Sequence, residues 1–179
     1  MTTKIKIKNR GFTLVEALVS IAILVTAVTG AYTAAQSGIS SSIFSKNQII
    51  AFYLAGEGVE QIRNRRDENG LKSTPDWLVN IAGPAGTGYA CDDGNVCMID
   101  AVANTITKCP SGVCPNLRLD PVRGFYGYDG TYASTTIFNR EIRMKKINND
   151  EWSISVIVNW SKGLVQRSFE VRENIMNWQ

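Results

Sequence analysis

Residues 11–25 read GFTLVEALVSIAILV and begin a long apolar run. Apolar residues are dense from Phe12 to about Ala35, and no charged residue occurs from Ala17 to Ser45. A helix that crosses a bilayer needs roughly 20 apolar residues, so this run is long enough to span a membrane. Inside lipid, the backbone polar groups of a single segment must be satisfied within that segment, so we expect the run to be helical.

Glu16 is the charged residue within this run. A carboxylate in a spanning helix costs about 2.5–3.5 kcal/mol at the bilayer centre and less near the interface. Two interpretations of Glu16 remain open. The amine of a neighbouring chain supplies the opposite charge, or the carboxylate lies at the headgroup level and stabilises the positive end of the helix dipole.

The order of residues here resembles the processing site of type IV prepilins and type II secretion pseudopilins, over roughly residues 4–36. A basic leader ends at Gly11, Phe12 follows, and Glu16 is the fifth residue after the glycine. In that family a membrane-bound aspartic peptidase cleaves after the glycine and N-methylates the new first residue. The glutamate then pairs with the amine of the next subunit. The resemblance therefore implies processing at Gly11 and Phe12 and assembly through Glu16.

The chain departs from the pattern of major pilins in its helix. Major pilins often carry a proline in mid-helix, whereas this chain has no proline between Phe12 and Pro75. Gly30 is a weaker flexible point at that place. This departure, the length of the chain and its cysteine-rich segment favour a minor pilin over a major pilin or a type II pseudopilin.

The net charge comes from the leader. The chain has 19 Lys and Arg against 16 Asp and Glu, and four of the basic residues precede Gly11, so removing them leaves 15 basic residues. The basic excess therefore favours an orientation with the leader in the cytoplasm, and it gives little support for a nucleic-acid surface. We expect a single-pass inner-membrane protein with an exported head, which becomes part of a cell-surface filament after assembly.

Helical spacing returns after the polar stretch 36–42. Apolar residues recur at intervals of three and four at Phe52, Ala55, Val59 and Ile62. We expect one continuous helix from Phe12 to about Asp67, and the alternative is two helices joined near Ser40. The charge cluster 63–68, followed by Asn69-Gly70, marks the expected helix end.

The resemblance and this layout together predict an α+β, pilin-like fold. A long N-terminal helix, transmembrane in its first half, packs on a small C-terminal antiparallel sheet with a cysteine-containing loop region. The expected parts are a basic leader over 1–11, the membrane or filament-core half of the helix over 12–36, its second half over 37–69, and an exported head over 70–179.

Four cysteines lie in the loop-rich middle of the chain, at Cys91, Cys97, Cys109 and Cys114. An exported domain lies in an oxidising space, so we expect two disulfides. Four cysteines allow three pairings, and the local one, which closes two small loops, is favoured slightly. The alternative is a zinc site, although the spacings differ from the common ribbon pattern. Asp92-Asp93-Gly94-Asn95 offers oxygen ligands for calcium, but we interpret it as a solvated polar turn.

The last third of the chain has the pattern of antiparallel strands. Apolar residues fall at every second position from Trp152 to Trp160, which predicts a strand with one buried face. Strands are also expected over 135–147 and from Val165 onward, with turns at 148–150 and at Lys162-Gly163. Short strands are expected in the middle region at 96–100 and near 125–128.

The sequence lacks the usual residues of catalysis. It contains no histidine, the commonest general base and metal ligand. It also has no phosphate-binding loop and no nucleophile elbow. We predict no enzyme activity, no cofactor and no metal.

The expected partners follow from the resemblance. They are other pilin subunits, the prepilin peptidase and methyltransferase, the inner-membrane assembly platform, and membrane lipid before assembly, whereas nucleic acid is not expected. A second class of function is a singly anchored exported binding or adhesion module.

Overall fold

The computed structural model describes residues 11–72, 74, 76–130 and 134–177. Residues 1–10, which form the predicted leader up to Gly11, lie outside the described residues. Contacts divide the chain into two units, residues 1–46 and residues 47–179.

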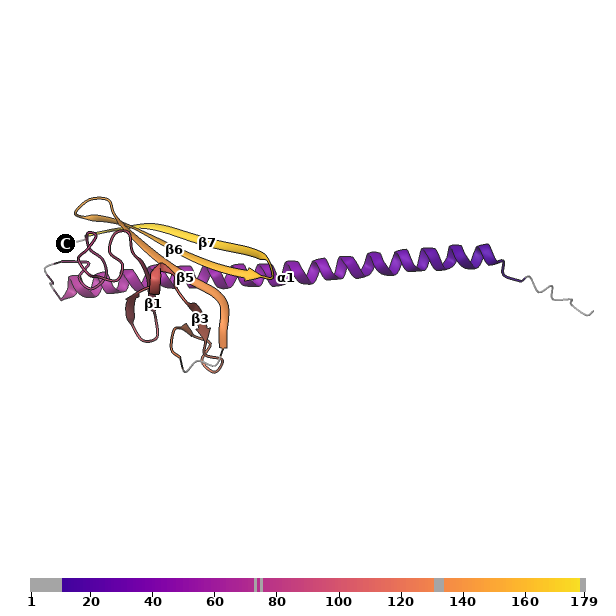
Figure 1. The fold of residues 1–179 in the computed structure, drawn as a ribbon, viewed down its shortest axis with the longest axis horizontal. Coiled ribbons are helices and arrows are strands. Elements are labelled where there is room, and N and C mark those ends of the chain that lie inside the picture. The colour runs from indigo at the N-terminus through magenta and orange to yellow at the C-terminus, as the bar shows by residue number, and fades with distance from the viewer. Residues whose placement is uncertain (1–10, 73, 75, 131–133, 178–179) are drawn as a thin grey trace, which may run out of the picture. The chain divides into compact units, whose positions relative to one another are not determined.

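One helix, α1, runs from Leu14 to Leu71 over 58 residues (Figure 1). It continues through Ser40 without a break, so the expectation of a continuous helix is confirmed. Its end lies four residues beyond Asp67, because Asn69 and Gly70 still have helical geometry. Asn69 is buried, and its Nδ2 donates to the carbonyls of Trp77 and Val79, which ties the helix end to the following loop.

The second unit contains an antiparallel sheet. Its strands are β1 (Val96–Asp100), β2 (Thr105–Lys108), β3 (Asn116–Leu119), β4 (Tyr126–Gly127), β5 (Ser134–Lys146), β6 (Glu151–Lys162) and β7 (Val165–Met176), and a short 3₁₀ helix covers Pro110–Gly112. β5 is central: β6 pairs with one edge, while β3 and β1 pair with successive parts of the other. β2, β4 and β7 extend the sheet from β1, β3 and β6. The expected α+β architecture is confirmed.

The core lies between the sheet and the part of α1 that begins at Asn47. The helix contributes the buried face Ala51, Leu54, Ala55, Gly58, Val59 and Ile62. From β6 the residues at every second position from Trp152 to Trp160 are buried, which confirms the predicted alternation. Helix and sheet approach closely at Gly58, where an added Cβ would lie 3.0 Å from Cγ1 of Val156.

Two disulfides brace the loop-rich region. They join Cys91 to Cys97 and Cys109 to Cys114, which is the local pairing. Cys91 and Cys97 are fully buried in the main core, beside the loop residues Trp77 and Leu78. The second pair forms a smaller cluster with Val96. Zinc ligation is therefore wrong as an interpretation of these thiols.

The interpretation of Asp92 as a solvated turn residue is also wrong. Asp92 is 1% exposed, and its carboxylate accepts hydrogen bonds from Gly83 N at 2.9 Å, Thr87 Oγ1 at 2.6 Å and Gly88 N at 2.8 Å. Two of these donors bind Oδ1 and one binds Oδ2, so protein groups surround the carboxylate. Asp92 therefore organises the loop before β1 from inside, as a buried carboxylate does when donors surround it.

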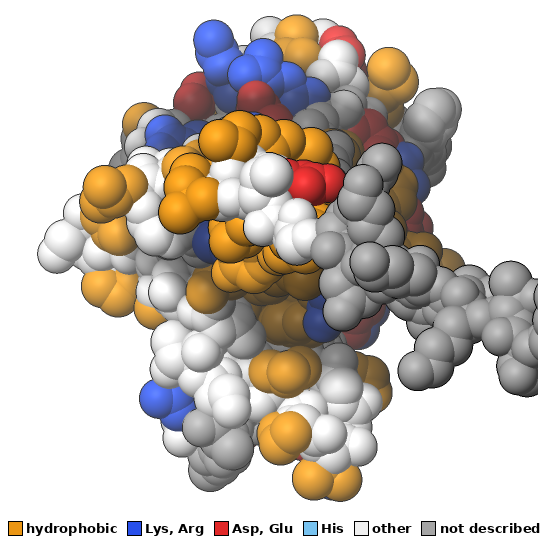
Figure 2. Space-filling view, turned by 90° about the vertical axis from the view of Figure 1, so that its right-hand side faces the viewer, with side chains coloured by type: hydrophobic (Ala, Val, Ile, Leu, Met, Phe, Trp, Pro, Cys, Tyr) orange, Lys and Arg blue, Asp and Glu red, His pale blue; other side chains and the backbone are white. Residues whose placement is uncertain are grey.

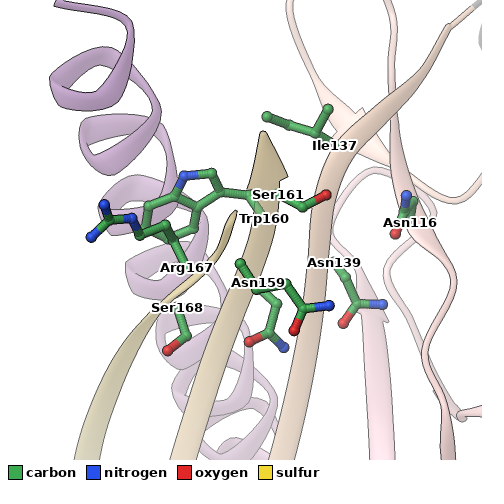
Figure 3. A pocket seen from close by; sticks show the side chains of 9 residues that line it. Asn116, Ile137, Asn139, Asn159, Trp160, Ser161, Arg167 and Ser168 are labelled. Atoms are coloured by element: carbon green, nitrogen blue, oxygen red, sulfur yellow. The ribbon is translucent and has the colours of Figure 1, made fainter. Parts of the chain in front are cut away.

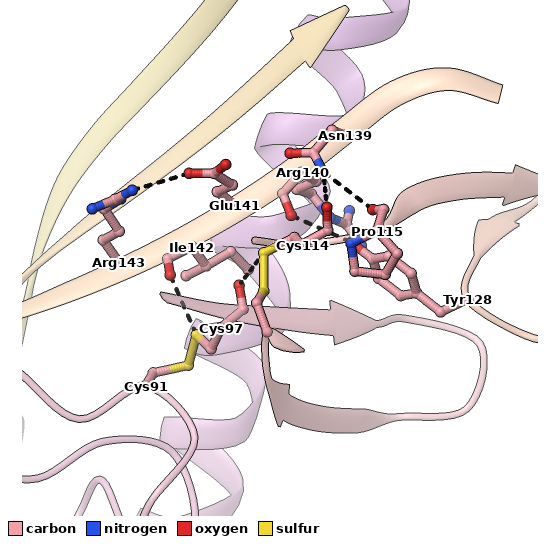
Figure 4. The surroundings of a disulfide bond; sticks show 11 residues. Cys91, Cys97, Cys114, Pro115, Tyr128, Asn139, Arg140, Glu141, Ile142 and Arg143 are labelled. Carbon is pink, nitrogen blue, oxygen red and sulfur yellow. Dashed lines mark hydrogen bonds and ion pairs between the residues drawn. A yellow bond between two sulfur atoms is a disulfide. The ribbon is translucent and has the colours of Figure 1, made fainter. Parts of the chain in front are cut away.

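A buried arginine joins the helix to the sheet. Arg140 on β5 is 0% exposed, and its Nη1 donates to the Leu54 carbonyl at 3.0 Å and to Glu57 Oε2 at 2.6 Å. Its Nη2 donates to the Ile99 carbonyl on β1 at 2.6 Å. The hydroxyl of Tyr128 donates to the Arg140 carbonyl (Figure 4). Burial raises the pKa of the Tyr128 phenol.

Charged residues near the end of α1 form ion pairs and hydrogen bonds with the sheet and its turns. Arg63 pairs with Glu60 and with Glu173 of β7, and these carboxylates raise its pKa. Arg65 donates to the carbonyl and side chain of Asn104, in the turn between β1 and β2. These contacts fasten the helix end to two parts of the sheet.

Candidate processing and assembly site

The first turn of α1 is capped by the residue that precedes it. Thr13 precedes the helix, and its Oγ1 accepts a hydrogen bond from Glu16 N at 3.2 Å. A threonine at the N-cap satisfies one of the amides that have no partner inside the helix. Glu16 occupies the third helical position, where glutamate is favoured after such a cap. Gly11 and Phe12 precede this helix terminus, and Glu16 lies in its first turn.

The Glu16 carboxylate is exposed and forms no ion pair among the described residues. Glu16 lies in the first turn of α1, where the helix dipole favours a negative charge. This place agrees with the interpretation in which the carboxylate stabilises the positive end of the helix dipole. That contribution leaves the carboxylate's hydrogen-bonding capacity unused, because the Glu16 bond to Thr13 is made by its backbone. A cation from a second molecule therefore has access to it.

The helix surface beyond Glu16 is apolar and uncovered in the single chain. Within this helix lies a window of 18 residues that is apolar enough to cross a membrane, and none of its residues is buried. Hydrophobic side chains gather in the middle of the face that Figure 2 shows. The large exposed side chains include Phe12, Leu14, Val15, Leu18, Val19, Ile21, Ile23, Leu24, Val25 and Val28.

The hydroxyl groups on this surface are satisfied within the helix. Ser20 donates to the Glu16 carbonyl at 2.7 Å, and Thr29 donates to the Val25 carbonyl at 2.8 Å. Thr26 and Thr33 donate to carbonyls three or four residues earlier in the same way. Such bonds to the preceding turn let a hydroxyl lie in an apolar medium without an external partner.

Among the described residues there is no group of three or more His, Cys, Asp or Glu side chains that would hold a metal ion. Its buried polar side chains contact protein groups instead. Asp100, for example, accepts from the amides of Val102 and Ala103 and from the amide of Tyr128. These polar residues hold loops and strands in place.

Residues 6–32 match the family model described as the prokaryotic N-terminal methylation motif. No curated protein and no solved structure matches the chain. The motif and the long apolar helix packed on an antiparallel sheet support the type IV pilin and pseudopilin family, whose members are structural proteins. The same features indicate a single-pass membrane anchor.

The sequence predicted roles for Gly11, Phe12 and Glu16, which stay predictions, and the buried Arg140 was not predicted. A signal for it exists in the sequence, because Phe138, Ile142 and Met144 place Arg140 at an inward position of the same strand. A charge at an inward position requires partners, and the partners come from α1 and β1.

Proposed function

We propose that this chain is a minor-pilin-like subunit of a type IV filament. In this proposal it is cleaved after Gly11, N-methylated at Phe12 and assembled through its N-terminal helix and Glu16. The observation that carries the proposal is the combination at one terminus of an uncovered apolar helix, a capping threonine and an exposed carboxylate without an ion-pair partner among the described residues.

The proposed organisation has four parts. Residues 1–11 are the leader, which remains in the cytoplasm. Residues 12–36 span the inner membrane and later form the filament core, residues 37–69 continue the helix, and residues 70–179 are the exported head. Prepilin peptidase and the inner-membrane assembly platform act on the chain in this orientation.

The helix changes its surroundings during assembly. Before assembly, lipid covers the exposed apolar side chains of residues 12–36. Afterwards, helices of other subunits cover them. Lipid tails are as apolar as leucine, so association depends on packing and on polar contacts more than on escape from solvent. Small residues of this segment, among them Ala17, Ala22 and Gly30, allow close approach of helices.

Glu16 supplies the polar contact in this mechanism. Cleavage after Gly11 creates an amine on Phe12, and that amine on one subunit is the cation for Glu16 of its neighbour. A charge pair within an apolar bundle is favoured because either charge alone costs several kcal/mol in a medium of low dielectric constant. The pair therefore fixes the axial position of one helix against the next.

The proposal is tested by the processed terminus and by two variants. Sequencing and intact mass of the protein from cells should give a chain that begins at N-methylated Phe12. Glu16→Ala should be processed and exported normally but lost from sheared filaments. Glu60→Ala, which changes an exposed carboxylate further along α1, is the matched control and should assemble.

Two outcomes contradict the proposal. An uncut chain beginning at Met1, in cells with active prepilin peptidase, excludes the processing pathway. Normal recovery of Glu16→Ala in filaments contradicts the assembly role of Glu16. A processed chain found only in the membrane turns the function toward an anchored binding module or a pseudopilin.

A further inference from the structure

A polar groove lies on the face of the sheet opposite α1. Its volume is about 500 Å³. Side chains with amide or hydroxyl groups dominate its lining. They belong to Asn116, Asn139, Asn159, Ser161, Gln166 and Ser168. Figure 3 shows Asn139 and Asn159 on neighbouring strands, with the Trp160 ring turned toward α1.

Strand register places four of these side chains in one row. Asn139 on β5 is paired with Asn116 on β3 and with Asn159 on β6, and Asn159 is paired with Ser168 on β7. Adjacent strands lie about 4.8 Å apart, so a row across four strands extends over about 14 Å. The row is therefore long enough to contact several groups of an extended ligand.

Backbone contacts hold two of the amides in place. Asn116 Nδ2 donates to the Thr136 carbonyl at 3.1 Å, and Asn139 Nδ2 donates to the carbonyls of Cys114 and Pro115. Asn159, inside the row, is half-buried, and its side-chain amide has no hydrogen-bond partner among the described residues. Its amide therefore offers two donors and an acceptor beside Asn139, whose fixed position lowers the entropy cost of binding.

The lining selects the chemical class of the ligand. Arg167 at the rim is the charged residue among the described lining residues, and no carboxylate lines the groove. The apolar side chains are Ile137, which is 43% exposed, and Trp160, which is 6% exposed. A strongly charged or an apolar ligand would thus find little complementary surface.

A peptide strand is also disfavoured at this place. β5 and β6, which form the floor, have partner strands on both edges, so their backbone groups are already paired. A ligand lying over these two strands is therefore recognised by side-chain amides and hydroxyls, each of which can donate and accept. Neighbouring hydroxyl groups of a sugar have the same dual capacity.

We propose that this groove binds a neutral glycan. The inference rests on the proposed function in one respect, since export places the groove outside the cytoplasm. A single groove with few apolar contacts should bind weakly, with a Kd of about 1 mM. Repetition of the groove along a filament would raise the avidity without any new contact.

The test uses the full chain, purified in detergent and fluorescently labelled, on an array of neutral oligosaccharides that also carries sialylated and sulfated glycans. We expect binding to neutral glycans and a loss of about tenfold or more in affinity for Asn159→Leu. Asn159→Asp keeps the shape of the side chain but removes its two donors, so it should also bind less. Ser153→Ala, on the same face of β6 but outside the groove, is the matched control and should bind normally.

Absence of binding to every neutral glycan, a preference for the acidic ones, or full binding by both Asn159 variants would overturn the inference. Thermal unfolding of each variant shows whether a loss of glycan binding comes from misfolding. If Asn159→Leu misfolds, glycan binding by Asn159→Asp tests the inference. Glu16→Ala should bind glycans like the unchanged chain in detergent. Failure of assembly and failure of glycan binding are therefore distinguishable.

Discussion

Arg140 on β5 and Leu54 in α1 are joined by a hydrogen bond of 3.0 Å from the guanidinium to the backbone carbonyl. The bond crosses the main core, and the same guanidinium also reaches Ile99 on β1. One side chain thus links the helix, the central strand and the disulfide-bonded strand. Breaking such a buried contact is costly because the groups left behind lose their partners.

Arg140→Ala should lower the free energy of unfolding by about 2–4 kcal/mol, because it opens a cavity and leaves carbonyl groups without a donor. Arg140→Met fills much of the same space and should cost less. Denaturant unfolding of the full chain in detergent, followed by the fluorescence of the buried Trp152 and Trp160, measures both. Equal stability of the alanine variant and the unchanged chain would show that the arginine is dispensable.

Gly58 and Gly56 make a matched pair in α1. An added Cβ at Gly58 meets Val156 at 3.0 Å, whereas nothing lies within 4 Å of one at Gly56. Gly56→Ala should raise stability by about 0.5–1 kcal/mol through helix propensity. Gly58→Ala should lower it by about 1 kcal/mol, because overpacking exceeds that gain. The two midpoints of thermal unfolding should therefore shift in opposite directions, and a shared direction would contradict the close packing.

Asp92→Ala should loosen the loop before β1. The change removes the acceptor for Gly83, Thr87 and Gly88, and buried donors without partners cost about 1–3 kcal/mol. Hydrogen exchange measured by mass spectrometry should become faster in residues 83–93. Asp93→Ala, a change at the neighbouring carboxylate, serves as the control. Unchanged hydrogen exchange in the Asp92 variant would show that the hydrogen bonds to Asp92 do not stabilise the loop.

Glu170 makes part of the stability depend on pH. Hydrogen bonds from Arg172 and then from Ser155 lower the pKa of its carboxyl below the ordinary value of 4.5. A carboxyl whose pKa is lower in the folded state contributes stability above its ordinary pKa and loses it as the pH falls through the folded-state pKa. Stability should therefore decline below about pH 4.5. The decline should be smaller in Glu170→Gln, as unfolding curves at pH 7 and pH 3 would show, and superimposable pH profiles would contradict this assignment.

The main elements of the fold could be predicted because their periodicity is strong. The apolar run and the spacing from Phe52 to Ile62 predicted α1, and the alternation from Trp152 to Trp160 predicted β6. β2 and β3 were missed. Each has four residues, and β2 is mostly exposed, so neither shows a repeated apolar pattern.

The polar features were harder to predict because they depend on register. Asn116, Asn139 and Asn159 lie about 20 residues apart along the chain and become neighbours only through strand pairing. Asp92 stands in a sequence typical of an exposed turn, and its burial depends on where the surrounding loop folds. In contrast, Gly11, Phe12 and Glu16 are close in sequence, so a local motif was sufficient to predict a role for them, and that role stays a prediction.

The hydroxyls of Ser20, Thr26, Thr29 and Thr33 have a kinetic consequence. Each is bonded to the preceding turn of its own helix, so it has no hydrogen bond to exchange when the surroundings change. Leaving lipid for a bundle, or returning to lipid, then requires no bond to break at these positions. In the proposed function the same surface suits transfer in both directions, so a subunit released from a filament would return to the bilayer and be used again.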